Sequence, residues 1–154
     1  MGRVEWKSQL AAAAEALLPE YLAGGELTAF TVMAFGAPGG GQMRSVTFVV
    51  NSVPPWKQTP ADDGEKCRQY ERRCALQEEA RKIFAGLQMF SGCCAVIIRY
   101  SRNAGRADGA NIIGGILDGL QGIAYQNDKQ VTEITYREWS GDQDWYQVAV
   151  IELA

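Results

Sequence analysis

Three aspartates, Asp108, Asp118 and Asp128, stand ten residues apart in a stretch that is otherwise poor in charge. The residues between the first two are apolar and rich in glycine, so we expect a short buried helix framed by carboxylates. Hard cations such as Mg²⁺ take oxygen ligands, and usually only one or two of them are protein carboxylates. Two or three of these aspartates would therefore be enough for a divalent-metal site.

The same aspartates also have a purely structural interpretation. Asp108 can cap the helix, Asp118 can lie on its solvated face, and Asp128 can occupy a turn before a strand. Spacing alone favours this interpretation, because such residues commonly serve helix ends and turns. A preference for the metal site has to come from a wider pattern.

That wider pattern resembles the signature of the RusA family of Holliday-junction resolvases, in which Asp-x-Asp-Asn leads into a lysine-bearing helix, then Leu-Asp-x-Leu, then Asp-Asp-x-Gln. The agreeing positions keep the order and spacing of the signature: Asp108, Asn111, Leu117, Asp118, Leu120, Gly122, Tyr125, Asp128 and Gln130. Upstream, Val53-Pro54-Pro55-Trp56-Lys57 is similar to the family's early Pro-Pro turn. The resemblance covers residues 44–154 and leaves residues 1–43 outside.

Three positions depart from the family signature. Ala110 stands where the family has its second metal-binding aspartate, Gly114 where it has the helix lysine, and Asn127 where it has the first of two late aspartates. The missing lysine removes a charge that could stabilise the attacked phosphodiester. The resemblance therefore implies either a nuclease in which other groups compensate, or a relative whose cleavage is weak or lost.

For an active enzyme, the resemblance implies a Mg²⁺- or Mn²⁺-dependent endodeoxyribonuclease that resolves branched DNA in recombination and repair. Asp108 and Asp128 would be the catalytic metal ligands, Asp118 would supplement them, and a metal-activated water would attack the phosphodiester. Asn111 and Gln130 would support the motif. A homodimer is also implied, since two symmetric cuts need two copies of one site.

Two other functions remain open at this point. One is a degenerate homologue that binds branched DNA without cutting it, as Ala110 and Gly114 suggest. Its mark would be salt-sensitive DNA binding that does not depend on metal. The other is a small dimeric scaffold that binds no nucleic acid, which fits the overall acidity of the chain.

Charge is unevenly distributed, although the net charge is only −3. Residues 1–43 carry a net −2, residues 44–106 a net +5 and residues 107–154 a net −6. A metal-dependent nuclease would divide its charges in this way, with cations along the DNA backbone. The alternative is a solvated, salt-bridged surface. The cations that we assign to DNA contact are Lys57, Arg102, Arg106 and Lys129.

The chain contains no histidine, which excludes Ser-His-Asp and Cys-His catalysis by its own residues and leaves carboxylate and metal chemistry. Its cysteines form no Cys-x-x-Cys pair, so we expect no structural zinc site. Adjacent Cys93 and Cys94 should point to opposite faces of a strand. We expect all of the cysteines to be small apolar core residues in a reducing compartment: Cys67, Cys74, Cys93 and Cys94.

Hydrophobic periodicity predicts the elements that position the motif. Apolar residues at helical spacing predict helices at 6–21, 66–87 and 111–121. In the second helix Asp63 would be the N-cap, and the inward side chains would be Tyr70, Cys74, Ile83, Phe84 and Leu87. Runs rich in β-branched and aromatic residues predict strands at 27–35, 44–52, 93–100, 131–137 and 145–153.

Two glycine-rich stretches carry separate expectations. Residues 36–42 would form either a hairpin loop or a flexible linker, and we favour the hairpin. Gly114 and Gly115 each cost about 1 kcal/mol relative to alanine inside a helix. Such a cost suggests close approach by another backbone, a subunit or a nucleic-acid strand.

These elements predict an α+β fold, in which a mixed sheet packs in two layers against helices, and the resemblance to the RusA family implies the same. We divide the chain into an N-terminal helix and strand extension at 1–43 and a RusA-like domain at 44–154. No apolar stretch has membrane-spanning length. The apolar run at 10–18 contains Glu15 and lacks a clear cleavage site, so we expect a cytoplasmic protein.

Overall fold

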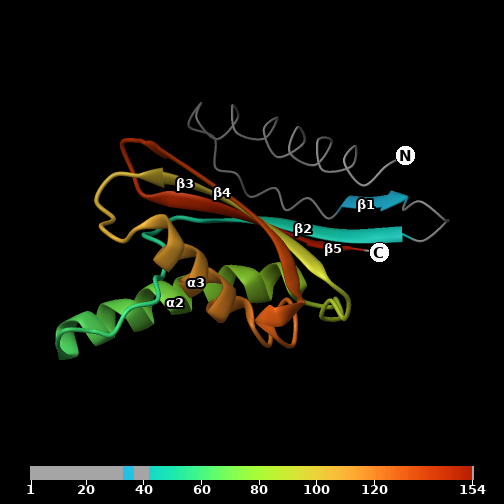
Figure 1. Ribbon diagram of the computed structural model, residues 1–154, viewed down its shortest axis with the longest axis horizontal. Coiled ribbons are helices and arrows are strands. Elements are labelled where there is room, and N and C mark those ends of the chain that lie inside the picture. Colours follow the sequence, from blue (N-terminus) through green and yellow to red (C-terminus); the bar gives the residue numbers. More distant parts are fainter. Residues whose placement is uncertain (1–32, 37–41, 154) are drawn as a thin grey trace.

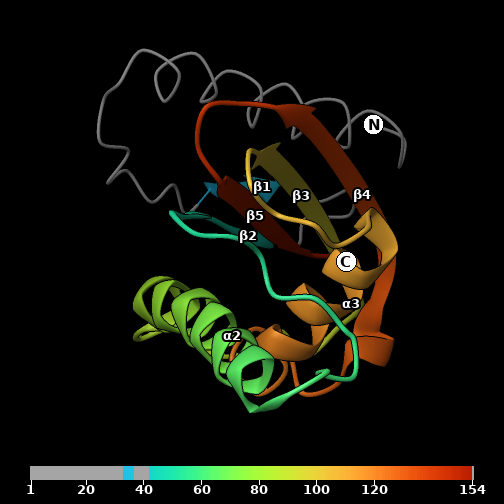
Figure 2. The same ribbon diagram turned by 90° about the vertical axis from the view of Figure 1, so that its left-hand side faces the viewer.

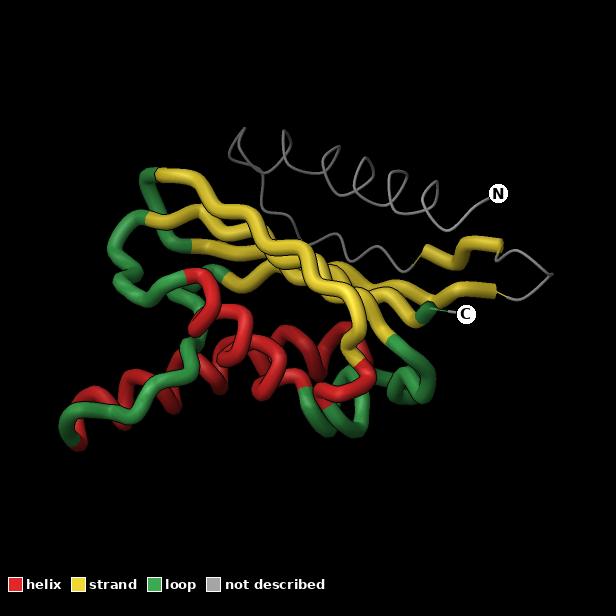
Figure 3. The backbone as a smooth tube through the Cα atoms, viewed as in Figure 1, coloured by secondary structure: helices red, strands yellow, loops and turns green. Residues whose placement is uncertain are grey.

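The computed structural model describes residues 33–36 and 42–153, which form a mixed sheet with α2 and α3 on one face (Figure 1). The sheet order is β1-β2-β5-β3-β4. The strands are β1 (Met33–Gly36), β2 (Gln42–Val50), β3 (Cys94–Arg102), β4 (Val131–Ser140) and β5 (Trp145–Glu152). The helices are α2 (Asp63–Phe84), α3 (Gly109–Leu120) and the short 3₁₀ helix η1 (Asp128–Gln130). Figure 3 shows strands and helices in separate layers, which confirms the expected α+β fold.

The pairing of β3 with β4 determines where the motif lies. These two strands are parallel, whereas every other neighbouring pair in the sheet is antiparallel. A parallel pair needs a crossover connection, and α3 provides it on the helical face of the sheet (Figure 2). The helix therefore leads from the end of β3 back to the level at which β4 begins.

The core lies between the sheet and the two helices. Alternate residues of the inner strands point into it: Val46, Phe48, Val50, Val96, Ile98, Tyr100, Tyr146, Val148 and Val150. From α3, Ile112, Ile116 and Leu120 face the sheet at four-residue spacing. From α2, the buried residues are Leu76, Ala80, Ile83 and Phe84.

The N-terminal half of α2 departs from the prediction. Its N-cap is Asp62, whose carboxylate accepts a 2.7 Å hydrogen bond from the Glu65 N–H, so the assignment to Asp63 is wrong. Ile83 and Phe84 are buried as predicted, but Tyr70 is 70% exposed and Leu87 is also exposed. Figure 1 shows the first turns of α2 projecting beyond the sheet.

The cysteines are less buried than we expected. Cys94 is buried and Cys74 is half-buried, but Cys67 and Cys93 are exposed, and all are free thiols. The prediction of four core cysteines is therefore wrong for Cys67 and Cys93. Cys67 lies on the projecting part of α2, and Cys93 precedes the first residue of β3.

The hairpin favoured for residues 36–42 agrees with the strand pairing. β1 pairs antiparallel with the start of β2, from Met33 opposite Ser45 to Gly36 opposite Gln42. Of the strand predicted at 27–35, the structure describes only the end, and the helix predicted at 6–21 lies outside the described residues. The proposed boundary at residue 44 falls within β2, and the division into two parts stays a prediction.

The remaining predicted helices and strands form with ends shifted by at most three residues. Within the part of the chain that the structure describes, no helix is both long enough and apolar enough to cross a membrane.

Candidate functional site

Asp108 is the N-cap of α3. Its Oδ1 accepts a 2.8 Å hydrogen bond from the backbone N–H of Asn111, and its Oδ2 lies 3.3 Å from Asn111 Nδ2. The two residues that head the motif therefore hold each other, and the capping interpretation of Asp108 is confirmed. Capping does not hide the carboxylate, which belongs to an exposed residue at the positive end of the helix.

The loop that delivers Asp108 is fastened by Asp144, a residue that the sequence did not single out. The Asp144 carboxylate accepts hydrogen bonds from the N–H groups of Asn103 and Ala104, at 3.0 and 2.7 Å, and from the Tyr100 hydroxyl. Burial opposes ionisation of Asp144, but these donors outweigh it and hold its pKa below the usual value. An ionised Asp144 thus fixes the end of β3 and the start of the motif loop.

The two loop arginines have different surroundings. Arg102 forms an ion pair with Glu138, with Nη2 3.2 Å from Oε1, and donates a 2.7 Å hydrogen bond to the Gly105 carbonyl. Hydrogen bonding to Arg102 holds the pKa of Glu138 below its usual value. Arg106 is exposed and pairs with no carboxylate in the described residues. Of the two, only Arg106 offers an uncommitted guanidinium.

Asp118 lies near the other end of α3 and faces a lysine. Its Oδ2 is 3.4 Å from Lys57 Nζ, and its side chain is 30% exposed. The solvated position that we considered for Asp118 is therefore a half-buried carboxylate that pairs with an exposed lysine. A metal ion would therefore have to compete with the Lys57 ammonium group for the Asp118 carboxylate.

Lys57 reaches Asp118 because its segment crosses α3 at the glycine pair. The Lys57 N–H donates a 2.9 Å hydrogen bond to the Asn111 carbonyl. A Cβ on Gly115 would come within 2.7 Å of Trp56 Cα, and a Cβ on Gly114 would lie 3.3 Å from the Lys57 stem. Close approach by another backbone, expected from the glycines, is thus confirmed. The lysine lies over Gly114, where the family signature has its own lysine.

Asp128 and Gln130 belong to η1, which follows α3. The Gln130 amide accepts from the N–H groups of Gln126 and Asn127 and donates to the carbonyls of Phe90 and Gly92. Asn127 caps η1 by accepting from the Lys129 N–H at 2.9 Å. The departure at Asn127 and the motif residue Gln130 therefore both have local structural roles.

The Asp128 carboxylate has no such role. Asp128 is half-buried, and no described residue donates a hydrogen bond to its carboxylate oxygens. Next to it, Lys129 is exposed and pairs with no carboxylate within the described ranges. Both side chains are therefore available to a ligand.

The predicted metal ligands do not meet within one chain. A helix rises 1.5 Å per residue, so the ten residues from Asp108 to Asp118 correspond to about 15 Å. Asp108 follows β3 and Asp128 precedes β4, and the parallel pairing puts these points at opposite ends of the sheet. In residues 33–36 and 42–153, no three His, Cys, Asp or Glu side chains are grouped to hold a metal ion.

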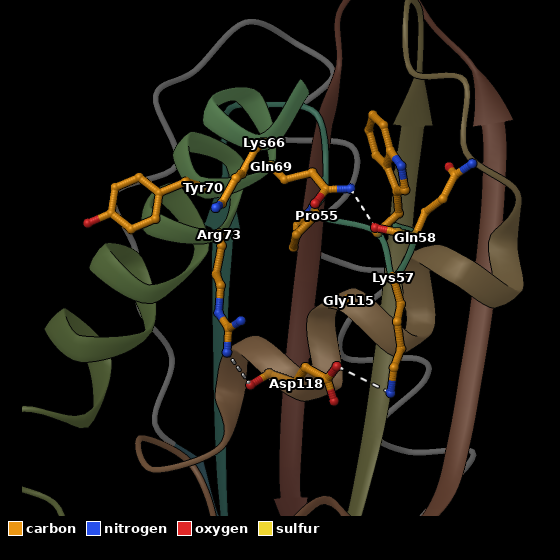
Figure 4. Close-up of a pocket in the computed structure, with 10 residues that line it drawn as sticks. Pro55, Lys57, Gln58, Lys66, Gln69, Tyr70, Arg73, Gly115 and Asp118 are labelled. Atoms are coloured by element: carbon orange, nitrogen blue, oxygen red, sulfur yellow. Dashed lines mark hydrogen bonds and ion pairs between the residues drawn. The ribbon is translucent and has the colours of Figure 1, made fainter. Parts of the chain in front are cut away.

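A pocket of about 330 Å³ opens between α2, α3 and the segment that crosses α3 (Figure 4). Its charged and polar lining from α2 consists of Lys66, Gln69, Tyr70 and Arg73. Their spacing of three, four and seven residues was visible in the sequence as one helical face, but Tyr70 was assigned to the core. The other lining residues are Pro55, Trp56, Lys57, Gln58, Gly115 and Asp118.

The chain is similar to one family of known proteins over a segment that includes the crossover helix α3. The model of a family described as endodeoxyribonuclease RusA matches residues 56–151, which is more than half of the chain. No curated protein matches the chain. The matched part includes Lys57, α3 and all three aspartates of the motif.

Proposed function

This chain belongs to the RusA family of endodeoxyribonucleases, and we propose from this membership that it is a metal-dependent nuclease that resolves Holliday junctions in recombination and repair. Resolvases of the family generally depend on a divalent metal, and they act on branched DNA. The functional question for this chain is how two separated carboxylates could serve one ion.

The proposed ligands are Asp108 and Asp128. Both fit a hard cation, because Asp108 is exposed and Asp128 receives no hydrogen bond on its carboxylate from the described residues. When bound, Mg²⁺ or Mn²⁺ would supply Lewis-acid stabilisation of the phosphoryl oxygens and activation of water. Two carboxylates are within the usual number for Mg²⁺, so the alanine at position 110 does not by itself prevent binding.

The observation that carries the proposal is the separation of these carboxylates, which lie at opposite ends of the crossover that joins β3 to β4 through α3. Ligands of one ion lie only a few ångströms apart, so one chain cannot supply both. In a two-fold dimer, however, if Asp108 of one protomer meets Asp128 of the other, the reverse contact also forms. We call the pair formed by Asp108 of one protomer and Asp128 of the other a shared site. Each homodimer would hold two.

The remaining residues have supporting roles. Lys57 lies over Gly114 and brings an ammonium group to α3 from outside the helix, which offsets the missing helix lysine. Asp118 positions this lysine rather than binding the ion. Arg106 and Lys129 are exposed and uncommitted beside the two ligands, so we propose them, with Lys57, as phosphate contacts. Arg102 stabilises the loop through Glu138.

The test mixes two inactive subunits. We expect Asp108→Asn and Asp128→Asn homodimers to bind a synthetic four-way junction but not to cut it with Mg²⁺. Co-expression with two affinity tags yields heterodimers of the two variants. In a heterodimer one shared site has lost both carboxylates and the other has kept both, so we expect nicking to return.

The controls separate the outcomes. Re-mixed subunits of the same variant should stay inactive, and a linear duplex should not be cut. An inactive heterodimer would contradict the shared site, whereas cleavage by the Asp128→Asn homodimer would contradict the role of Asp128. A chain that shifts the junction equally in EDTA and in Mg²⁺, and cuts in neither, is the binding-only relative that Ala110 makes the second candidate.

A further inference from the structure

The pocket between α2 and α3 has an excess of positive charge. Lys57, Lys66 and Arg73 line it, and Asp118 is the lone carboxylate in its lining. Most other cations of α2 are paired with carboxylates, since Arg68 and Arg72 share Glu65 and Lys82 pairs with Glu79. The two pocket cations of α2, by contrast, form no ion pair with any described residue. The pocket therefore suits an anion.

The pocket walls are held together by hydrogen bonds. Gln69 Nε2 donates to the Gln58 carbonyl at 2.8 Å, and Gln77 Nε2 donates to the Gly119 carbonyl at 3.2 Å. Figure 4 shows Arg73 and Lys57 extending toward Asp118, whose carbonyl accepts a 3.4 Å hydrogen bond from Arg73 Nη2 and whose carboxylate pairs with Lys57. The absent side chain of Gly115 lets the opposite wall approach α3. These contacts hold the pocket walls, and the cations that they carry, in position before an anion binds.

An aromatic ring stands at the rim of this cationic pocket. Tyr70 is 70% exposed, and its ring extends from α2 away from Asp118 (Figure 4). Exposed aromatic rings beside cations are the usual means of holding unpaired nucleotides, because every base can stack and every phosphate is charged. An acidic peptide would use the cations but would gain little from the ring.

We propose that this pocket binds one unpaired nucleotide of a DNA strand, with its phosphate between Lys66 and Arg73 and its base against Tyr70. The site is separate from the two metal ligands and needs no metal. The choice of DNA rests on the proposed function, whereas the nucleotide chemistry rests on the pocket. Branched DNA supplies such nucleotides where strands exchange partners.

The test measures binding of the full chain to a short fluorescent oligodeoxythymidylate by anisotropy, in EDTA and over a range of salt concentrations. We expect Arg73→Gln to weaken binding and to reduce the salt slope by about 0.7, the value for one phosphate of a single strand. Tyr70→Ala should weaken binding about tenfold with the slope unchanged. Arg81→Gln is the matched control, because Arg81 is an exposed cation of α2 outside the pocket.

Several results would overturn the proposal. Equal losses in Arg73→Gln and Arg81→Gln would mean diffuse attraction to α2. Displacement by polyglutamate as effective as that by unlabelled oligonucleotide would indicate an acidic peptide. Equally effective displacement by thymidine monophosphate or inorganic phosphate would assign the pocket to a free phosphate compound instead of a strand.

A second measurement separates this site from the proposed nuclease. Asp128→Asn should bind the oligonucleotide like the unmodified protein, whether or not any variant cuts a junction. If the unmodified chain cuts junctions but Arg73→Gln binds the oligonucleotide normally, the pocket proposal fails and the nuclease stands. If no junction is cut but the Arg73 and Tyr70 effects appear, the pocket proposal stands and the nuclease proposal fails.

Discussion

At Gln130 a single amide joins two turns of the chain. Its oxygen accepts two backbone N–H groups before η1, and its nitrogen donates to Phe90 O at 2.8 Å and Gly92 O at 3.0 Å. A carboxylate of the same shape keeps the first pair of bonds and loses the second. Gln130 is thus a structural member of a motif that also contains three aspartates.

We expect Gln130→Glu to lower the free energy of unfolding by about 2 kcal/mol, because two carbonyls lose their donor and face a negative charge. Urea unfolding at neutral pH measures the change. Gln126→Glu introduces the same charge on a nearby exposed residue and should have little effect. Equal stability of the two variants would contradict this role of Gln130.

The depressed pKa of Asp144 makes a prediction about acid. An aspartate whose folded pKa lies below its unfolded value stabilises the fold above the unfolded pKa and loses this effect as pH falls through the folded pKa. We therefore expect Asp144→Asn to cost stability at neutral pH and to cost progressively less on acidification. Urea unfolding at several pH values tests this, with exposed Asp142→Asn as control. A loss independent of pH would refute the electrostatic cause.

Some residue roles were predictable from the sequence and others were not. The capping of α3 by Asp108 follows from local spacing, because the cap and its partner Asn111 are three residues apart. Asp62 and Asp63 are adjacent equivalents, so the sequence could not choose between them. The pair of Lys57 with Asp118 joins distant parts of the chain and depends on tertiary packing.

At the scale of elements, α3 is built for contact with the segment at Pro55. Gly115 and Gly114 face this segment differently. A Cβ on the first would meet backbone, with Trp56 Cα only 2.7 Å away, whereas a Cβ on the second would meet a flexible lysine stem at 3.3 Å. Neighbouring glycines in one helix thus differ in what a methyl group would displace.

We expect Gly115→Ala to destabilise the protein by about 1–3 kcal/mol, since backbone must move to admit the methyl group. Gly114→Ala should be near neutral, because the gain in helix propensity, about 1 kcal/mol, offsets a small shift of Lys57. Thermal unfolding of the two variants provides the comparison. A larger loss at Gly114 than at Gly115 would reverse our interpretation of the crossing.

The sequence indicated the type of almost every described element but not how far each extends past its neighbours. We grouped Tyr70 with Ile83 among the inward residues of α2, but thirteen residues at 3.6 per turn put their side chains roughly 140° apart around the helix. The buried residues Leu76, Ala80, Ile83 and Phe84 all lie in the C-terminal half, which packs against the sheet. Periodicity identifies a face, whereas burial also requires an element opposite it.

At the scale of the whole molecule, the proposed shared site predicts one cut for each intact pair of carboxylates. A heterodimer of Asp108→Asn and Asp128→Asn would have one intact site. We expect it to nick one strand of a four-way junction and to leave it unresolved, while the unmodified dimer makes paired cuts. Denaturing and native gels of the same reaction distinguish a nicked junction from resolved duplexes. Paired cuts by the heterodimer would contradict one site per cut.

The family was accessible from the sequence, because the motif lies within a continuous stretch and its spacing survives the three departures. The arrangement of the ligands was not. Ten-residue spacing is equally compatible with carboxylates that converge and with carboxylates held apart by a straight helix. Only the parallel pairing of β3 with β4 shows that Asp108 and Asp128 lie at opposite ends of the crossover.

If each shared site joins Asp108 of one protomer to Asp128 of the other, the crossover helix becomes a molecular ruler. The distance between the two cutting centres of the dimer then equals the distance between these aspartates within a single chain, which depends on α3, about 18 Å long, and on the turn and η1 that follow it. The number of turns in α3 would then help to determine the distance between the two scissile phosphates. Lengthening α3 by one turn would change this distance by about 5 Å.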